Sequence, residues 1–378
     1  MPAEPGAVEP GAVVLPRELV PGDGRFGSGP SKVRHDAVAR LSAAAPRLLG
    51  TSHRREGVRD LVRRIRTGLT DLWNLPDGYE VLLGNGGTTV FWDAAILGLI
   101  ERRSEHLAFG EFSSKFASAA RAAPHLDDPV VIESEPGTHP EPVADPSVDA
   151  YALTHNETST GVMTNVRRPS HTGLTLVDAT SAAGAMPVDP REFDVYYFAP
   201  QKVFGSEGGL WVAACSPAAI ARIETIAASG RWCPPSLDLS IALQNSRLDQ
   251  TYNTPAIATL FLLADTVEWI NGNGGLEWSA RRCEQSAEIV YGWAEASPHA
   301  SPFVAKPAER STVTATIDFE GVSAADLAVA LRANGIVDTE SYRKLGRNQL
   351  RIAMFPAIEP QDLATLTRAI DHIIDAIS

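Results

Sequence analysis

The sequence has little cysteine and no long apolar run. Its three cysteines, Cys215, Cys233 and Cys283, are scattered without a CxxC spacing, so neither a disulfide framework nor a zinc site is indicated. No apolar stretch is long enough to span a membrane, and the first residues lack the basic and apolar regions of a secretory signal. We therefore expect a cytoplasmic protein with no bound metal and no membrane partner.

Positive charge is also scarce. The 33 Lys and Arg residues stand against 46 Asp and Glu, which gives a formal net charge of −13 and argues against nucleic acid as a partner. Only five of the basic residues are lysines, and Lys202 is one of them. Arginine cannot lose its proton to form an imine, whereas a desolvated lysine can. A lone lysine is usually a solvated surface charge, so the neighbours of Lys202 must decide its role.

The length of 378 residues and a hydrophobic content of 44% allow a large buried core and indicate two domains. Residues 1–25 are rich in Pro and Gly and predict an N-terminal arm, in which Val13 to Leu15 could dock onto another element. The Asn-Gly-Asn-Gly-Gly run at 271–275 is a clear break. We place a large domain at 26–271 and a smaller C-terminal α+β domain at 272–378.

Short apolar strands alternate with helices through most of the chain. This alternation predicts an α/β fold with a mostly parallel sheet that is flanked by helices on both faces. Helices are expected at 34–45, ending before Pro46, and at 57–74, 90–100, 217–228, 236–248, 255–270, 276–296, 324–333 and 360–377. Strands are expected at 79–83, 106–109, 130–133, 150–154, 175–177, 195–198, 210–214, 311–319 and 349–354.

A glycine-rich stretch, Gly84-Asn85-Gly86-Gly87-Thr88-Thr89, lies between the first expected strand and a helix. A strand, a glycine loop and a helix in this order present free backbone N–H groups and a positive dipole end to a phosphate. The loop is not a P-loop, because no Lys-Ser/Thr pair follows at the required place. By itself it indicates either an anion site or a tight turn.

Polar residues follow three of the expected strands. Thr158 lies in the loop after strand 150–154, Asp178 follows strand 175–177, and Lys202 follows strand 195–198. The carboxyl ends of parallel strands meet at one edge of a sheet, where ligands bind. We therefore expect these three side chains to lie close together.

This set of residues suits pyridoxal 5'-phosphate. Its aldehyde needs a lysine, its ring nitrogen needs a buried carboxylate, and its phosphate needs a glycine-rich helix start. Phe112, after the expected strand 106–109, could cover the face of the ring, although an aromatic residue there could equally be part of the core.

From Phe26 to the C-terminus, the chain resembles the fold-type I, class V pyridoxal-phosphate-dependent aminotransferases. The resemblance rests on the stretches His155-Asn156-Glu157-Thr158-Ser159-Thr160-Gly161, Asp178-Ala179-Thr180-Ser181, Ala199-Pro200-Gln201-Lys202 and Tyr252-Asn253-Thr254-Pro255. The spacing between Asp178 and Lys202 also matches the class.

The resemblance implies a role for each residue of the cofactor site. Lys202 is expected to be the Schiff-base lysine and Asp178 the partner of the pyridine nitrogen. Thr158 would bond the phenolic oxygen, and Phe112 would stack on the ring where many relatives have tryptophan. The residues implied to hold the cofactor phosphate are Gly87, Thr88 and Gln201, with Asn253 and Thr254 reaching the phosphate of the neighbouring subunit. A homodimer with active sites at its interface follows from this expectation.

The resemblance also implies where substrates bind. His53 and Arg54 would receive the distal carboxylate or phosphate, Arg351 the α-carboxylate, and Arg343, from the other subunit, would assist phosphate binding. The expected reaction is a ping-pong amino transfer from glutamate to a phosphorylated keto acid, 3-phosphohydroxypyruvate, in serine biosynthesis. Whether 4-phosphohydroxythreonine, a substrate in pyridoxine biosynthesis, is also accepted stays open.

Two departures from the family pattern concern the substrate side. The glycine loop lacks the charged residue that many relatives carry, and Tyr342 stands where many have histidine. The following insert, Lys344 to Asn348, could supply replacement cations through Lys344 or Arg347.

Three alternatives are weighed. An alanine–glyoxylate or serine type of class V aminotransferase would share the cofactor residues without needing several distal cations. A cysteine desulfurase-like lyase needs a catalytic cysteine late in the chain, and none follows Cys283. A non-catalytic binding protein would be expected to lose Lys202 or Asp178, and both are present.

Overall fold

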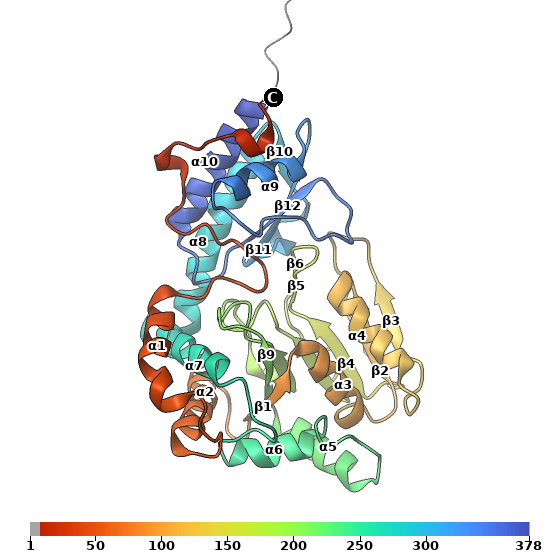
Figure 1. The fold of residues 1–378 in the computed structure, drawn as a ribbon. Coiled ribbons are helices and arrows are strands. Elements are labelled where there is room, and N and C mark those ends of the chain that lie inside the picture. Colours follow the sequence, from red (N-terminus) through yellow and green to blue (C-terminus); the bar gives the residue numbers. More distant parts are fainter. Residues whose placement is uncertain (1–7, 378) are drawn as a thin grey trace, which may run out of the picture.

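The computed structural model describes residues 8–377, so the first seven residues of the predicted arm lie outside the described part. Figure 1 shows a central sheet with helices on both faces and, above it, a smaller unit formed by the C-terminal part of the chain. The predicted α/β class is confirmed.

The central sheet has seven strands in the order β1-β9-β8-β7-β4-β2-β3. Their bounds are β1 Glu80–Gly86, β2 Ser104–Ala108, β3 Val130–Glu133, β4 Ala150–Thr154, β7 Leu174–Asp178, β8 Val195–Phe198 and β9 Gly209–Cys215. Strands β8, β7, β4, β2 and β3 pair in parallel, and β9 runs antiparallel to both β1 and β8. The sheet is therefore mostly parallel, as predicted.

Side chains that alternate along β8 separate the two layers of helices. Tyr196 and Phe198 pack into the core under α2 and α7, whereas Tyr197 points into the second core under α3 to α6. This alternation follows from the two-residue period of a strand, and it explains why β8 is apolar throughout. The helices are α1 His35–Leu48, α2 Glu56–Trp73, α3 Thr88–Gly98, α4 Glu111–Ala122, α5 Pro217–Ala228, α6 Leu239–Arg247 and α7 Ile257–Gly272.

The C-terminal unit contains a three-stranded antiparallel sheet in the order β10-β11-β12. Its elements are α8 Gly275–Ala296, β10 Ala300–Pro302, β11 Thr314–Phe319, α9 Ala324–Ala333, β12 Gln349–Ala353 and α10 Pro360–Ile377. Its apolar core is continuous with the core on the α2 and α7 side of the large sheet. The division at 271–272 stays a prediction.

The described part of the N-terminal segment lies against the C-terminal unit. Val13 and Leu15 are buried, and both bond through their backbone to Asn334, with Leu15 N donating to Asn334 Oδ1 at 2.9 Å and Asn334 Nδ2 donating to Val13 O at 2.8 Å. Further along, Gly22 N donates to Asp362 Oδ1 at 2.8 Å. These hydrogen bonds attach the N-terminal segment to the C-terminal unit, although the two are more than 300 residues apart in sequence.

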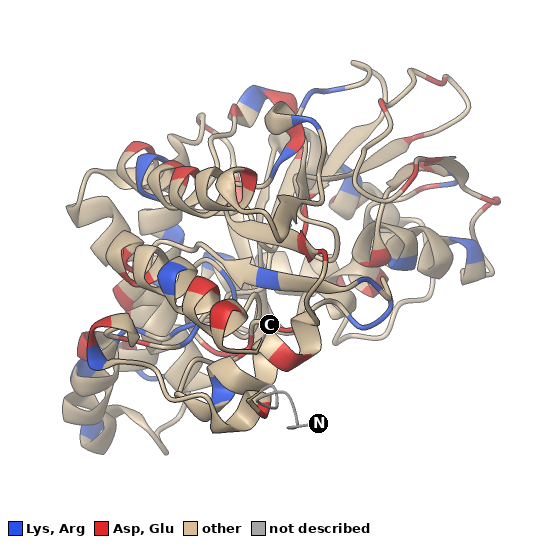
Figure 2. Cartoon of the chain, turned by 90° about the horizontal axis from the view of Figure 1, so that it is seen from above, with Lys and Arg blue, Asp and Glu red and all other residues tan. Residues whose placement is uncertain are grey.

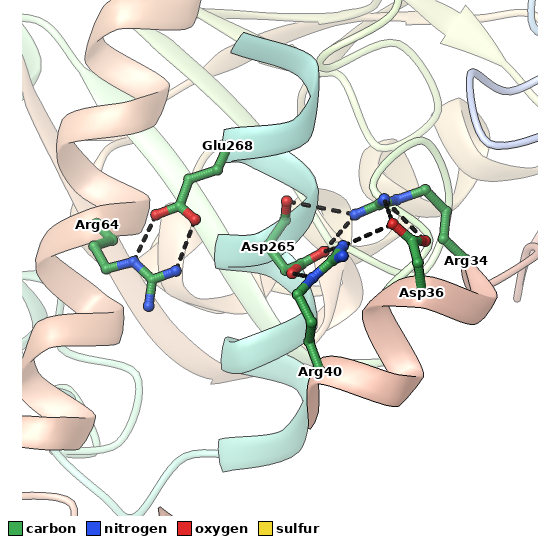
Figure 3. Close-up of polar contacts among 6 residues, drawn as sticks. All are labelled: Arg34, Asp36, Arg40, Arg64, Asp265 and Glu268. Atoms are coloured by element: carbon green, nitrogen blue, oxygen red, sulfur yellow. Dashed lines mark hydrogen bonds and ion pairs between the residues drawn. The ribbon is translucent and has the colours of Figure 1, made fainter. Parts of the chain in front are cut away.

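A network of arginines and acids ties α1 to α7 (Figure 3). Arg34, just before α1, donates to the buried Asp265 of α7 and lies 4.5 Å from the Trp269 ring. Arg40 Nε donates to the same carboxylate at 2.5 Å, and Asp36 Oδ2 accepts from both arginines at 2.8 Å. A buried charge is tolerable only when it is paired in this way. The network fixes the start of α1 and so the segment that precedes it.

Two local expectations were wrong. Helix α1 continues through Pro46 to Leu48, because a proline in the last turn removes only one helical hydrogen bond. Strand β1 extends to Gly86, beyond the expected end at 83, because Gly86 pairs with Gly209 of β9. Of the expected glycine loop, Gly87 alone precedes α3 as its N-cap.

Acidic and basic residues are interspersed over the helices in the view of Figure 2. Within residues 8–377, no helix is long and apolar enough to cross a membrane.

Candidate active site

A cavity opens at the carboxyl ends of β4, β7 and β8, where the sequence places its polar residues. It is lined by Gly87, Thr88, Thr89, Trp92, Phe112, Thr154, Asn156, Thr158, Asp178, Thr180, Gln201 and Lys202. Seven of the predicted residues, Gly87, Thr88, Phe112, Thr158, Asp178, Gln201 and Lys202, are therefore brought together in one chain.

Lys202 is buried in this cavity with its amine held in place. Its Nζ donates to Thr158 Oγ1 at 2.5 Å and lies 4.9 Å from the centre of the Phe112 ring. Burial lowers the pKa of Lys202 from 10.5 to about 8, against the opposing effect of the Asp178 carboxylate. A larger fraction of the amine is therefore uncharged near neutral pH than in a solvated lysine, which favours imine chemistry.

The segment before α1 covers Lys202 from the other side. Ser31 N donates to Gln201 O at 2.9 Å, and Ser31 Oγ donates to Lys202 O. At Gly29, where φ is +135°, a Cβ would lie 2.9 Å from Lys202 Cε. Only glycine suits this backbone and this close approach.

Asp178 lies at the end of β7 and is almost fully buried. Its Oδ1 accepts from Thr180 N at 2.9 Å and Thr180 Oγ1 at 2.6 Å, and its Oδ2 accepts from Trp92 Nε1 at 3.3 Å. Burial raises the pKa of Asp178, because these three donors only partly replace water around the carboxylate. A cationic ring nitrogen nearby would stabilise this carboxylate.

The start of α3 faces the same cavity. Gly87 is the N-cap and no atom lies within 4 Å of where its Cβ would be, so the backbone is open to a ligand. Thr88 Oγ1 lies 2.7 Å from Thr180 Oγ1. The first N–H groups of a helix have no partner within the helix and favour an anion. Gln201 Oε1 is buried without a hydrogen-bond partner, so it is free to accept a hydrogen bond from a bound group.

Arg351 reaches this region from β12 of the C-terminal unit. Its Nη1 donates to Thr158 O at 3.4 Å, and its guanidinium lies 5.3 Å from the Tyr342 ring. Its Nε is buried without a partner, and burial lowers the pKa of the guanidinium. The Tyr342 ring is also 6.0 Å from that of Phe112, so Tyr342 is close to both Arg351 and Phe112.

Four of the other predicted residues form a second group that does not line the cavity. His53 Nδ1 lies 3.1 Å from Thr254 Oγ1, and Thr254 O accepts from Asn85 Nδ2 at 3.1 Å. Arg54 Nη1 donates to Gln250 Oε1 at 2.9 Å. We call His53, Arg54, Asn253 and Thr254 the Arg54 cluster. Three of its four members, all but His53, are exposed.

The three cations between α9 and β12, namely Arg343, Lys344 and Arg347, have different surroundings. Arg343 is exposed, and Lys344 Nζ donates to Glu111 Oε1 at 2.5 Å beside Phe112. Arg347 is bound instead to Asp318 at 2.5 Å and lies 4.6 Å from the Phe303 ring. Of the two candidate replacement cations, Lys344 is therefore the one near the cavity.

Sequence reasoning gave no role to five residues that line the cavity: Thr89, Trp92, Thr154, Asn156 and Thr180. Thr180 lies two residues after Asp178 and could have been read as a turn that bonds the carboxylate. Trp92 is four residues after Thr88, hence on the same face of the helix that was expected to carry the phosphate. No local signal pairs Trp92 with Asp178, which is 86 residues away.

Comparisons with known proteins agree with this geometry. Residues 31–340 match the model of the family described as aminotransferase class-V. A phosphoserine aminotransferase of Nocardioides sp. is 60% identical over 369 residues, which cover 96% of this chain and 99% of that protein.

Two solved structures show the same fold. The crystal structure of a phosphoserine aminotransferase from Cytophaga hutchinsonii has a TM-score of 0.87 at 23% identity and covers 93% of this chain and 99% of its own. That of the PLP-bound phosphoserine aminotransferase from Trichomonas vaginalis has a TM-score of 0.76 at 18% identity, with coverages of 92% and 99%. From the sequence match and the high identity of the Nocardioides relative, the chain belongs to the class-V aminotransferase family.

Proposed function

We propose that this protein transfers an amino group from glutamate to 3-phosphohydroxypyruvate, giving 2-oxoglutarate and phosphoserine, with pyridoxal 5'-phosphate as cofactor. The observation that carries the proposal is the placement of a buried lysine, Lys202, against Thr158 and beside Asp178 at the carboxyl ends of the parallel strands. The name of the Nocardioides relative supports the choice of substrate.

The residues of the cavity fit the cofactor. When bound, pyridoxal phosphate supplies an electron sink that acidifies the proton on the substrate α-carbon. The chain offers one group for each part of it: Lys202 for the aldehyde, Asp178 for the ring nitrogen, Thr158 for the phenolic oxygen, Phe112 for the ring face, and Gly87, Thr88 and Gln201 for the phosphate.

Lys202 is also the proposed acid–base group. Because its pKa is about 8, Nζ can take a proton from the α-carbon and return it without a large cost in either direction. Thr158 Oγ1, at 2.5 Å, orients the amine. Thr180 and Trp92 each donate a hydrogen bond to the Asp178 carboxylate and so restrict its orientation.

Arg351 is the proposed binder of the α-carboxylate. Its flat guanidinium can bind a carboxylate through two parallel hydrogen bonds, and its buried Nε has no other partner. The contact of Nη1 with Thr158 O places it next to the residue that orients Lys202.

The distal anion would be bound by the Arg54 cluster of a second subunit. In one chain this cluster lies outside the cavity and is mostly exposed, which suits residues that complete a neighbour's site. The proposal therefore includes a homodimer in which Asn253 and Thr254 reach the partner's cofactor phosphate. Arg343, exposed on the loop before β12, would assist phosphate binding across the same interface.

An amino-acceptor panel tests the proposed substrate. With glutamate as donor, we expect kcat/KM for 3-phosphohydroxypyruvate to exceed that for hydroxypyruvate by about a hundredfold, because charge-assisted contacts to phosphate would be lost. Equal values for hydroxypyruvate, pyruvate or glyoxylate would instead indicate an alanine–glyoxylate type of enzyme. Adding 4-phosphohydroxythreonine as a donor tests a second, pyridoxine-pathway substrate.

The structure disfavours the lyase alternative. Cys283, the last cysteine of the chain, is fully buried on α8, and burial raises the pKa of its thiol well above the usual range. Such a thiol is a poor nucleophile. The cytoplasm is proposed as the compartment; that Cys215, Cys233 and Cys283 are all free supports it, since disulfides are rare there.

A further inference from the structure

One fully buried acid at the edge of the cavity has no part in the function proposed above. Glu157 lies on β5 (Asn156–Glu157), one residue before Thr158, and its relative exposure is 0%. Its Oε1 accepts from Ser159 Oγ at 2.7 Å and from Ser159 N at 3.2 Å. Its Oε2 accepts from Ser113 N, Phe112 N and Ser113 Oγ at 2.9, 3.1 and 3.0 Å.

These contacts hold the first turn of α4. The N-cap of this helix is Gly110, which has no side chain to bond the free N–H groups that follow. Glu157, on β5, accepts hydrogen bonds from two of these groups, the N–H of Phe112 and of Ser113. Ser159 Oγ accepts from a third, Glu111 N, at 3.0 Å. A Cβ at Gly110 would lie 2.3 Å from Glu157 Cγ, so the glycine leaves the space that the carboxylate occupies.

The turn that Glu157 holds carries Phe112. The backbone N–H of Phe112 is itself one of the donors, so the origin of the side chain is fixed directly. Its ring lies 4.9 Å from Lys202 Nζ. Glu157 therefore connects to the lysine by two routes: through the Phe112 ring, and along the chain through Thr158, whose Oγ1 binds Nζ.

We propose that Glu157 is a positioning residue that fixes the Phe112 ring over the bound cofactor and maintains a buried negative charge beside Lys202. The inference rests on the proposed function, because it assigns the ring of Phe112 to the cofactor.

The hydrogen bonds of Glu157 are those expected of a negatively charged carboxylate. All of its partners are N–H or O–H donors, which suits an ionised carboxylate because that group only accepts hydrogen bonds. Burial has the largest effect on the pKa of Lys202 and lowers it, whereas the negative charges of Asp178 and, to a smaller extent, Glu157 raise it by favouring the protonated amine. Removing the charge should therefore make the lysine nitrogen less basic.

The test compares Glu157→Gln with Glu133→Gln in the holoenzyme. Glutamine keeps the length of the side chain and removes the charge, while Glu133 is an exposed acid at the end of β3 that does not line the cavity. Two signals of the bound cofactor are recorded: the pH midpoint of its visible absorbance and its visible circular dichroism. For Glu157→Gln we expect the midpoint to fall by up to about one pH unit and the dichroism to weaken. Glu133→Gln should match the wild type.

Two further variants separate the routes. Phe112→Leu should weaken the dichroism. The double variant Phe112→Leu/Glu157→Gln should have the same dichroism as Phe112→Leu alone, but a lower pH midpoint. Ser159→Ala keeps the charge and removes hydrogen bonds at the turn, so it should weaken the dichroism without moving the midpoint.

A lower melting temperature of Glu157→Gln with both cofactor signals unchanged would overturn the inference, since a merely structural role predicts that result. If Glu157→Gln does not fold, an unchanged dichroism in Ser159→Ala would overturn it. A wild-type holoenzyme that binds the cofactor but fails the amino-acceptor panel would reject the proposed substrate and leave this inference standing.

Discussion

The cavity around Lys202 and the Arg54 cluster are organised in different ways. The cavity is buried and built from the ends of parallel strands, and the partners of Lys202 and Asp178 all come from the same chain. The Arg54 cluster lies on the loops before α2 and α7, and its contacts are to Gln250 and Asn85 rather than to the cavity. One chain thus supplies the groups around Lys202 and Asp178, whereas we propose that the Arg54 cluster of a second chain binds the distal anion and adds to the cofactor phosphate site.

The largest effect on activity is expected from replacing Lys202 in the cavity. Lys202→Ala should lower the transamination rate by at least about a thousandfold, because no other lysine is among the residues that line the cavity. The rate is measured with glutamate and 3-phosphohydroxypyruvate. Lys115→Ala is the matched control: Lys115 lies 5.7 Å from the Phe112 ring but is paired with Glu111 at the surface. A Lys202→Ala enzyme with near-normal turnover would refute the assignment.

Asp178→Asn should lower kcat by about a hundredfold with little effect on KM. The amide keeps the shape of the carboxylate but no longer supplies the negative charge that would keep a ring nitrogen protonated. Asp189→Asn, which changes an acid paired with Arg191 outside the cavity, should leave kcat unchanged. An unaltered kcat in Asp178→Asn would remove the carboxylate from the mechanism.

Arg54→Gln should raise KM by about tenfold to a hundredfold for glutamate and for 3-phosphohydroxypyruvate, since both lose a charge-assisted hydrogen bond. With alanine as donor, which has no distal anion, KM should not change. Arg351→Gln should instead raise KM for all three. If Arg54→Gln weakened alanine equally, the cluster would not be selective for the distal group.

A smaller effect is expected on the pH dependence of cofactor binding, which should depend on Lys202 in the cavity and not on the Arg54 cluster. The uncharged amine of Lys202 is the form that combines with the aldehyde, and burial lowers its pKa from 10.5 to about 8. The rate at which the apoenzyme takes up pyridoxal phosphate should therefore rise with pH and level off above about 8, as followed by visible absorbance. Arg54→Gln should leave this midpoint in place; a midpoint near 10 would show that Lys202 is solvated.

The sequence predicted the regular elements well where each has its own local signals. Strands β3, β4 and β8 and helices α5, α9 and α10 have the expected bounds, because apolar runs or faces end at proline, glycine or polar residues. The cavity was also predictable, since residues that follow parallel strands must meet at one edge.

The contacts that support the cavity could not be predicted in the same way. Glu157 bonds Phe112, 45 residues away, and Trp92 bonds Asp178, 86 residues away. Neither pair leaves a periodic pattern in the sequence. The short strands β5 and β6 (Val162–Met163) were missed as well, because two residues are too few to show alternation. The proposed position of the Arg54 cluster at a partner's cavity would depend on association of two chains, which no local sequence pattern encodes.

Hybrid dimers test the composite site most directly. Subunits carrying Lys202→Ala and Arg54→Ala are co-expressed with different tags, and the mixed dimer is purified and assayed for kcat/KM with 3-phosphohydroxypyruvate. In a composite site, the intact Lys202 of one subunit meets the intact Arg54 of the other, so we predict about half of the wild-type value. A dimer of wild-type and doubly substituted subunits should have almost none. Activity in the second hybrid and not in the first would contradict the account.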